Sequence, residues 1–212
     1  MKKGSNGANC ITSGKKVIQA DGTNCLGTDV SGTNAKLATL AQAVTDVGAF
    51  VTAAQAQPVD QVLPKIVVAT NDSQSIVDGH TGLNIITVPS VTLKRNTALT
   101  FTGAANNTDQ VVLIIAGNLK TGADSVLAPS NFVPSFSEAN LVILVLGHSV
   151  TVGKNAVLNG TIVAPNASCT LSAGFATLGA FICGKKVTLS NQDSLGDSGS
   201  ISFTAATGVV LP

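Results

Sequence analysis

The chain has 212 residues, of which 44% are hydrophobic, 11% charged and 3% aromatic, and it carries 12 Lys and Arg against 11 Asp and Glu. The net charge of +1 lacks the basic excess that phosphate contacts need, so we expect no nucleic-acid partner. The apolar content argues against disorder, and the longest apolar runs, Val111–Ala116 and Leu141–Leu146, are too short for a membrane span.

Residues 1–33 are rich in Gly, Ser, Asn and Thr and contain Cys10 and Cys25. We expect a loop or small hairpin closed by these cysteines. Lys2 and Lys3 have no apolar segment behind them, so a secretory signal is absent from this sequence or has been removed. With Cys169 and Cys183 the cysteines form two sequence-local pairs, which favours an oxidising, extracellular or cell-surface location. Four buried free thiols remain the alternative, and the spacing alone allows three disulfide connectivities.

Residues 34–57 have the pattern of an amphipathic helix. Asn34 is a suitable N-cap, and apolar residues recur every three or four positions until Pro58, at Leu37, Leu40, Val44, Val47 and Val51. We expect this helix to flank the domain that follows and to pack its apolar stripe on it.

Residues 58–199 contain short β-branched segments separated by Gly, Asn, Ser and Pro, which is typical of strands and turns. An internal repeat lies within them. Gly160–Ser172 aligns with Gly179–Ser190 at an offset of 19 that closes to 18, and Val150–Val152, Cys169–Leu171 and Val187–Leu189 align in successive repeats.

The repeat predicts a β-solenoid of about 18 residues per coil, in which each strand pairs with the coils above and below. Alternation along Val-Thr-Val points the flanking residues inward and Thr outward, so small aliphatic side chains and Cys fill the core. Residues 128–138 interrupt the period and are expected to form a loop. Residues 200–212 are strand-like and are expected to form a terminal strand or tail.

Four segments of the chain resemble bacterial surface proteins of the ice-binding-like and choice-of-anchor A group. They are Gly117–Gly122, Leu141–Gly147, Gly160–Ala167 and Gly179–Val187. The resemblance covers about residues 34–195. It implies an all-β fold with one long helix, namely a right-handed parallel β-solenoid with a flanking α-helix.

The repeat aligns one threonine per coil on an outward position, and serines extend the hydroxyl-rich face. These candidate binding residues are Thr92, Thr151, Thr170, Thr188, Ser149, Ser168 and Ser190. Regularly spaced hydroxyls on a rigid sheet suit ordered water or a repetitive ligand, although threonine also simply suits exposed strand positions. Lys120, Lys154, Lys185 and Lys186 interrupt or border the face, which counts against ice.

Catalytic patterns are lacking. The chain has two histidines, His80 and His148, and no nucleophile elbow, P-loop or metal-spaced cluster. One hexapeptide-like unit near His148 suggests an acyltransferase, but the repeat then loses the hexapeptide phase. We therefore predict no enzyme activity, no cofactor and no metal.

The function expected from these features is a non-enzymatic, secreted structural or adhesive surface protein. We expect the end coils of the solenoid to be incompletely capped. Such ends favour head-to-tail self-association into an extracellular fibre, in which the terminal strand pairs with a neighbouring molecule. The alternative is a module that binds ice or a polysaccharide through the Thr and Ser face.

Overall fold

The computed structural model describes residues 34–77, 79–102, 109–129 and 140–189. Helix α1 (Asn34–Ala56) begins at the expected Asn34. Towards its end, Val47, Phe50, Val51 and Ala54 lie on its less exposed side, as the apolar spacing predicts. The expected hairpin of residues 1–33 and the tail of residues 200–212 lie outside the described residues. The expected loop of residues 128–138 is wrong at its start, because Ala128 and Pro129 belong to strand β9 (Val126–Pro129), and its residues 130–138 lie outside the described residues.

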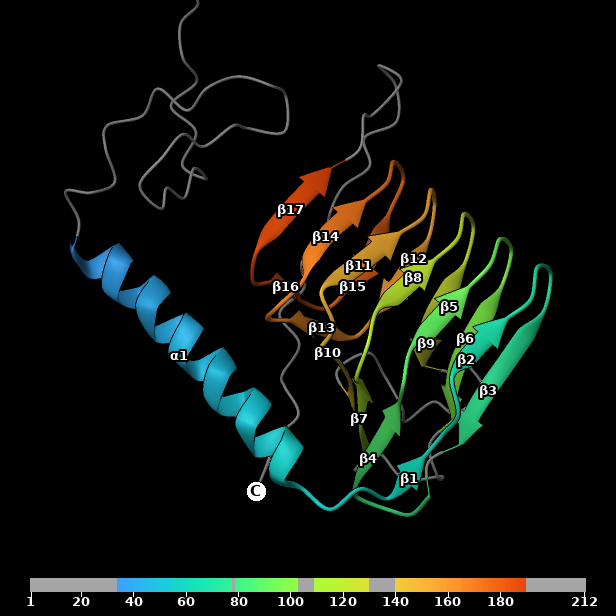
Figure 1. Ribbon diagram of the computed structural model, residues 1–212, viewed down its shortest axis with the longest axis horizontal. Coiled ribbons are helices and arrows are strands. Elements are labelled where there is room, and N and C mark those ends of the chain that lie inside the picture. Colours follow the sequence, from blue (N-terminus) through green and yellow to red (C-terminus); the bar gives the residue numbers. More distant parts are fainter. Residues whose placement is uncertain (1–33, 78, 103–108, 130–139, 190–212) are drawn as a thin grey trace, which may run out of the picture. The chain divides into compact units, whose positions relative to one another are not determined.

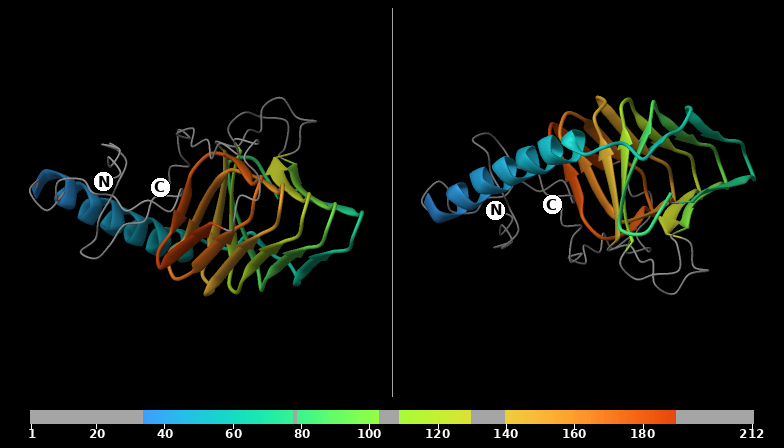
Figure 2. Two further views of the ribbon diagram at one scale, coloured as in Figure 1. Left: turned by 90° about the horizontal axis from the view of Figure 1, so that it is seen from above. Right: turned by 90° about the horizontal axis from the view of Figure 1, so that it is seen from below.

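The strands form three parallel sheets, and each coil contributes one strand to each sheet in turn, except that the last described coil contributes to the first two sheets (Figures 1 and 2). The first sheet contains β1 (Gln61–Val62), β4 (Leu83–Val88), β7 (Gln110–Ile115), β10 (Leu141–Val145), β13 (Thr161–Ala164) and β16 (Phe181–Cys183). The second sheet contains β2 (Ile66–Val68), β5 (Val91–Leu93), β8 (Leu119–Thr121), β11 (Ser149–Val152), β14 (Ser168–Leu171) and β17 (Lys186–Leu189). The third sheet contains β3 (Ser73–Val77), β6 (Ala98–Thr102), β9 (Val126–Pro129), β12 (Val157–Asn159) and β15 (Ala176–Leu178). The predicted fold class, a parallel β-solenoid with one long helix, is confirmed.

Coil length differs between the two halves of the solenoid. Ile143 pairs with Ile162, 19 residues further on, and Ile162 pairs with Phe181 after another 19. In the first half, Ile86 pairs with Leu113 and Leu113 with Ile143, at separations of 27 and 30. The expected coil of about 18 residues is therefore wrong for the early coils, because extra residues enter between each third-sheet strand and the next first-sheet strand.

The solenoid interior is filled by one buried aliphatic side chain after another in register. The first sheet contributes Ile86, Leu113, Ile143 and Ile162, the second Val91, Leu119, Val150 and Cys169, and the third Leu99, Leu127 and Leu158. The core also contains the aromatic rings of Phe101 and Phe175, so the expectation of a purely small aliphatic core is wrong at these two positions. Phe175 meets Phe181 edge to face, with ring centroids 6.0 Å apart.

The first sheet is buried on its outward side as well. Ile85, Val112 and Leu144 alternate with interior residues, yet each is at most 1% exposed. This explains the nearly continuous apolar runs of β7 and β10, because a parallel strand covered on both faces has no need for polar positions. Among the described strands, the first sheet thus exposes large outward side chains at its ends, at Val62 and Ile182, and the more extended outward surfaces belong to the second and third sheets.

The corner between the second and third sheets repeats one backbone conformation. Asn71, Asn96, Asp124 and Asn155 occupy successive coils and have φ between 53° and 62°, in the left-handed region that Asn and Asp tolerate best. Their side chains also pair across coils, because the Asn96 amide donates to the Asn71 Oδ1 at 3.1 Å. Gly174 takes the equivalent place in the next coil, with φ 70°.

Candidate functional site

The predicted threonines form one outward column on the second sheet. Thr151 pairs in register with Thr170, and Thr170 pairs with Thr188. Thr92 belongs to the same column, but Lys120 lies between Thr92 and Thr151 and pairs with both. Val67 starts the column in the first coil. The column is thus continuous in space but not uniform in chemistry.

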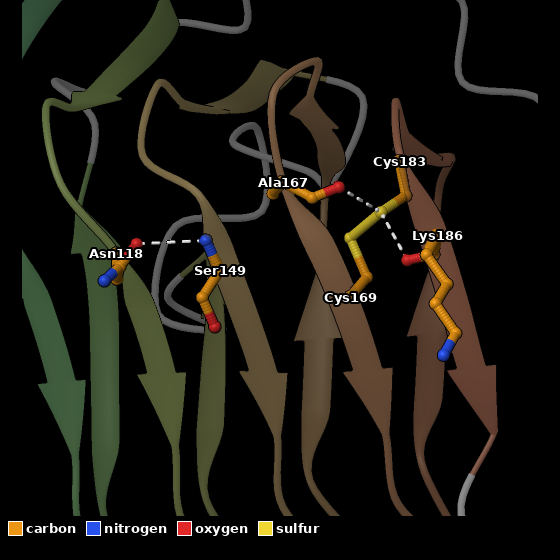
Figure 3. The surroundings of a disulfide bond; sticks show 6 residues. All are labelled: Asn118, Ser149, Ala167, Cys169, Cys183 and Lys186. Carbon is orange, nitrogen blue, oxygen red and sulfur yellow. Dashed lines mark hydrogen bonds between the residues drawn. A yellow bond between two sulfur atoms is a disulfide. The ribbon is translucent and has the colours of Figure 1, made fainter.

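The serines form the neighbouring column. Ser149 pairs with Ser168, and Ser168 pairs with Lys186 in the last described coil. In the coil that precedes Ser149, the Asn118 Oδ1 accepts a hydrogen bond from the backbone N–H of Ser149 at 3.0 Å (Figure 3). The same oxygen accepts the backbone N–H of His148, also at 3.0 Å. This contact across coils fixes the entry to β11. Ser190 lies outside the described residues.

The outward side of the third sheet was missed in the sequence. One column consists of Ser73, Ala98, Val126, Val157 and Ala176, paired in register from coil to coil. A second column contains Ser75, Thr100 and Ala128. None of the residues in these five strands is charged, and most outward positions are half-buried or exposed. We name this surface the uncharged face.

A sequence signal for the uncharged face did exist. Each of its strands begins two positions after the corner residue with positive φ, as in Asn96-Thr97-Ala98 and Asn155-Ala156-Val157. Such a turn residue fixes where the next strand starts, and the alternation then separates inward from outward side chains. The pattern lacks threonine in most coils, so a search for aligned hydroxyls passes over it.

A disulfide joins Cys169 of β14 to Cys183 of β16, with a Cα–Cα distance of 6.3 Å (Figure 3). It links the last coil to the one before across the corner of the first and second sheets. The Cys183 sulfur also lies 3.2 Å from the carbonyl oxygen of Ala167 and 3.3 Å from that of Lys186. Of the two alternatives left open by the sequence, a disulfide or buried free thiols, the structure has the disulfide for this pair, whereas Cys10 and Cys25 lie outside the described residues.

A polar cluster lies where the chain enters the first sheet. The Asp60 carboxylate accepts the backbone N–H of Ile85 at 2.7 Å and lies 3.1 Å from the His80 Nε2. The hydrogen bond from Ile85 holds the pKa of Asp60 below its ordinary value, with a further lowering by His80, against the opposing effect of burial. The buried Asn84 side chain binds the backbone of Gly79, His80 and Gly82. Apart from the contact between the Asp60 and His80 side chains, these polar groups bind backbone atoms, so we interpret the cluster as a structural one.

His148 is exposed at a corner, and it contributes its backbone to coil pairing. Within the described ranges, no three His, Cys, Asp or Glu side chains gather as metal ligands do. No helix in the described part of the chain has both the length and the apolar character of a membrane span. The absence of enzyme activity stays a prediction.

No protein-family model matches the sequence, and no curated protein matches it significantly. The fold is similar to the crystal structure of an ice-binding protein from the Antarctic ascomycete Antarctomyces psychrotrophicus, with a TM-score of 0.57 and 25% identity over 70% of this chain and 67% of that chain. It is also similar to a glycosylated ice-binding protein from an Arctic yeast, with a TM-score of 0.55 and 22% identity over 74% of this chain and 62% of that one, less than two thirds of its length. Both neighbours are fungal, so they support the ice-binding-like fold of the expected resemblance but not its bacterial, choice-of-anchor A assignment.

Proposed function

We propose that this chain is a secreted ice-binding protein that contacts ice through the uncharged face of the third sheet. The observation that carries the proposal is the run of small, uncharged side chains in register over five parallel strands. The likeness in fold to two ice-binding proteins supports it.

Ice offers a surface only of water molecules, so binding must come from many weak contacts made at once. A flat and rigid array needs little reorganisation to make them, whereas flexible side chains would lose conformational entropy on binding. Methyl and hydroxyl groups such as those of Ala98, Thr100 and Val126 can hold ordered water without competing strongly for it. A lysine keeps a tightly bound hydration shell that resists fitting to a lattice.

The two accessible surfaces differ in their charged side chains. Lys120 lies within the threonine column of the second sheet, and Lys186 continues its serine column. The strands of the third sheet have no charged residue. The uncharged face is therefore the better candidate, although the second sheet holds more threonine.

The test compares one bulky substitution on each surface, using thermal hysteresis and inhibition of ice recrystallisation by the purified full chain. We expect activity in the native chain, loss of most of it in Thr100→Tyr, and retention in the matched variant Thr151→Tyr. Both threonines are partly exposed strand residues, so the effects on folding are comparable, and circular dichroism checks this. A native chain without activity overturns the function, and loss confined to Thr151→Tyr overturns the choice of face.

Secretion is part of the proposal. The Cys169–Cys183 disulfide supports an oxidising compartment, since cytosolic thiols are kept reduced. An extracellular location is also where a protein can meet growing ice.

End-to-end assembly into a fibre, the function first expected from the sequence, has mixed support. Exposed valines at the first coil, Val62 and Val67, and Val187 at the last favour a contact between ends. However, a second copy that continued the second sheet in register would place Lys186 beside Lys65, since both extend the serine column. Like charges directly opposite each other destabilise paired strands, so we propose that the chain acts as a single solenoid. Light scattering of concentrated protein tests this, and growing particles would contradict it.

A further inference from the structure

The cationic side chains of the solenoid are gathered on one of its three sides. Every Lys and Arg between residues 61 and 189 belongs to the second sheet or to one of its two corners: Lys65, Lys94, Arg95, Lys120, Lys154, Lys185 and Lys186. All seven are exposed. We name this surface the cationic face. The modest net charge of the whole chain hides this segregation, because it averages over all sides.

Few acidic groups oppose these charges. Asp72 and Asp124 lie at the corner of the second and third sheets, and Asp124 is 3.6 Å from Arg95 through its Oδ2. Within the described ranges this is the one ion pair that involves the cationic face. Because both partners are well exposed, the pair leaves the positive potential largely intact.

The charges are spread along the solenoid axis. Lys65, Arg95, Lys120, Lys154 and Lys186 belong to five different coils. Neighbouring strands are about 4.8 Å apart, so the six coils place these charges along a line of roughly 24 Å. Between them lie the hydroxyls of the threonine and serine columns and the exposed Asn166. The surface therefore offers sparse positive charge with many hydrogen-bonding groups.

We propose that the cationic face binds an acidic polysaccharide whose chain runs along the solenoid axis. Such a polymer has widely spaced carboxylates or sulfates on a backbone rich in hydroxyls, which complements lysines separated by Thr and Ser. This binding is separate from the contact with ice, which uses a different sheet.

Two other polyanionic partners fit less well. Single-stranded nucleic acid is bound by stacking of bases on aromatic rings, and the strands of the second sheet contain no aromatic residue. An anionic membrane favours surfaces that add apolar side chains to the positive charge, and here only Val67 and Val187 are large, exposed and apolar on the second sheet.

The experiment measures binding of the full chain to polygalacturonate, with neutral dextran as the uncharged polymer. We expect binding to polygalacturonate alone, and affinity that falls as salt concentration rises. The triple variant Lys94→Gln, Lys120→Gln and Lys154→Gln should bind about tenfold more weakly, because three exposed charge contacts each contribute modestly.

The matched control changes Lys2, Lys3 and Lys15 to Gln, which lowers the net charge by the same amount but leaves the cationic face intact. It should bind like the native chain. Equal losses in both triple variants, or equal binding to dextran, would overturn the proposal. Tighter binding to single-stranded DNA or to vesicles containing phosphatidylserine would also overturn it. The Thr100→Tyr variant should keep full polysaccharide binding, which separates this proposal from the one on ice.

Discussion

The side-chain amide of Asn155 donates a hydrogen bond to the carboxylate of Asp124, in the preceding coil, at 3.1 Å. Both residues have positive φ, 54° and 56°, at equivalent places of the same corner. The residues that tolerate this backbone conformation thus also link the coils through their side chains. Solenoid stability here depends on corner residues as well as on the core.

Asn155→Ala tests this double role. The substitution forces alanine into the left-handed region, at about 1 kcal/mol, and removes the hydrogen bond to Asp124, for roughly another 1 kcal/mol. Urea unfolding should therefore show a loss of about 2 kcal/mol. Asn155→Gly loses the hydrogen bond without the strain, so it should destabilise less. Equal effects of the two variants would contradict a strained backbone at this corner.

A second test concerns the close approach of coils at the corner of the first and second sheets. A Cβ atom at Gly147 would overlap the carbonyl group of Gly117 in the preceding coil, and backbone cannot move aside as a side chain can. Gly147→Ala should therefore prevent native pairing of β8 with β11, and thermal unfolding should report a large loss of stability. Gly48→Ala is the control, because it lies in helix α1 with open space around it and should stabilise by up to about 1 kcal/mol. A Gly147→Ala protein as stable as the control would contradict the packing of these coils.

The sequence predicts the fold where the repeat is regular. From Val150 to Leu189 the coils are 18 or 19 residues long, so Thr151, Thr170 and Thr188 align in the sequence as they do in space. In the earlier coils the inserted residues break the period, and the pairing of Ile86 with Leu113 has no repeat to indicate it. Parallel pairing depends on which strands meet. The residues of a strand do not show how long the connection to its partner is, so the strand pattern does not indicate which early strands pair.

The candidate site was only partly predictable for a different reason. The threonine column was found because identical residues are visible in a sequence, and so was the lysine within it. The uncharged face consists of Ser, Ala, Val and Thr in changing order, which share size and neutrality but not identity. The clustering of lysines on one side also emerges only after the chain is wound, since Lys65 and Lys186 come from opposite ends of the solenoid.

A third prediction concerns pH. Asp60 has a lowered pKa in the folded chain, mainly because it accepts the Ile85 N–H and next because of His80. A carboxyl group with a lowered folded pKa stabilises the fold above its unfolded pKa of about 4, and this contribution is lost as pH falls through the lower folded value. Asp60→Asn should therefore destabilise at neutral pH by about 1 kcal/mol, less than the roughly 1.5–3 kcal/mol of a hydrogen bond to a charged group, because Asp60 is exposed and solvent screens its charge.

The check is urea unfolding of both proteins from neutral pH into the acid range. The two stabilities should converge as Asp60 protonates in the native chain. A gap that stays constant across this range would show that the Asp60→Asn variant is destabilised for steric reasons and not through the lost charge.

The last prediction is that the Cys169–Cys183 disulfide mainly stabilises the end of the solenoid. The bond closes a loop with a sequence separation of 14 residues, so its removal in the Cys169→Ala, Cys183→Ala double variant should cost about 3 kcal/mol. The loss of stability should be concentrated in β16 and β17. These strands form the last described coil, which has pairing partners on one side and exposes Ile182 and Val187. Hydrogen exchange should then speed up in β16 and β17 while β4, β7 and β10 keep their protection. Faster exchange spread evenly over all coils would mean instead that the solenoid opens as one cooperative unit, and that the disulfide stabilises it by restricting the unfolded chain.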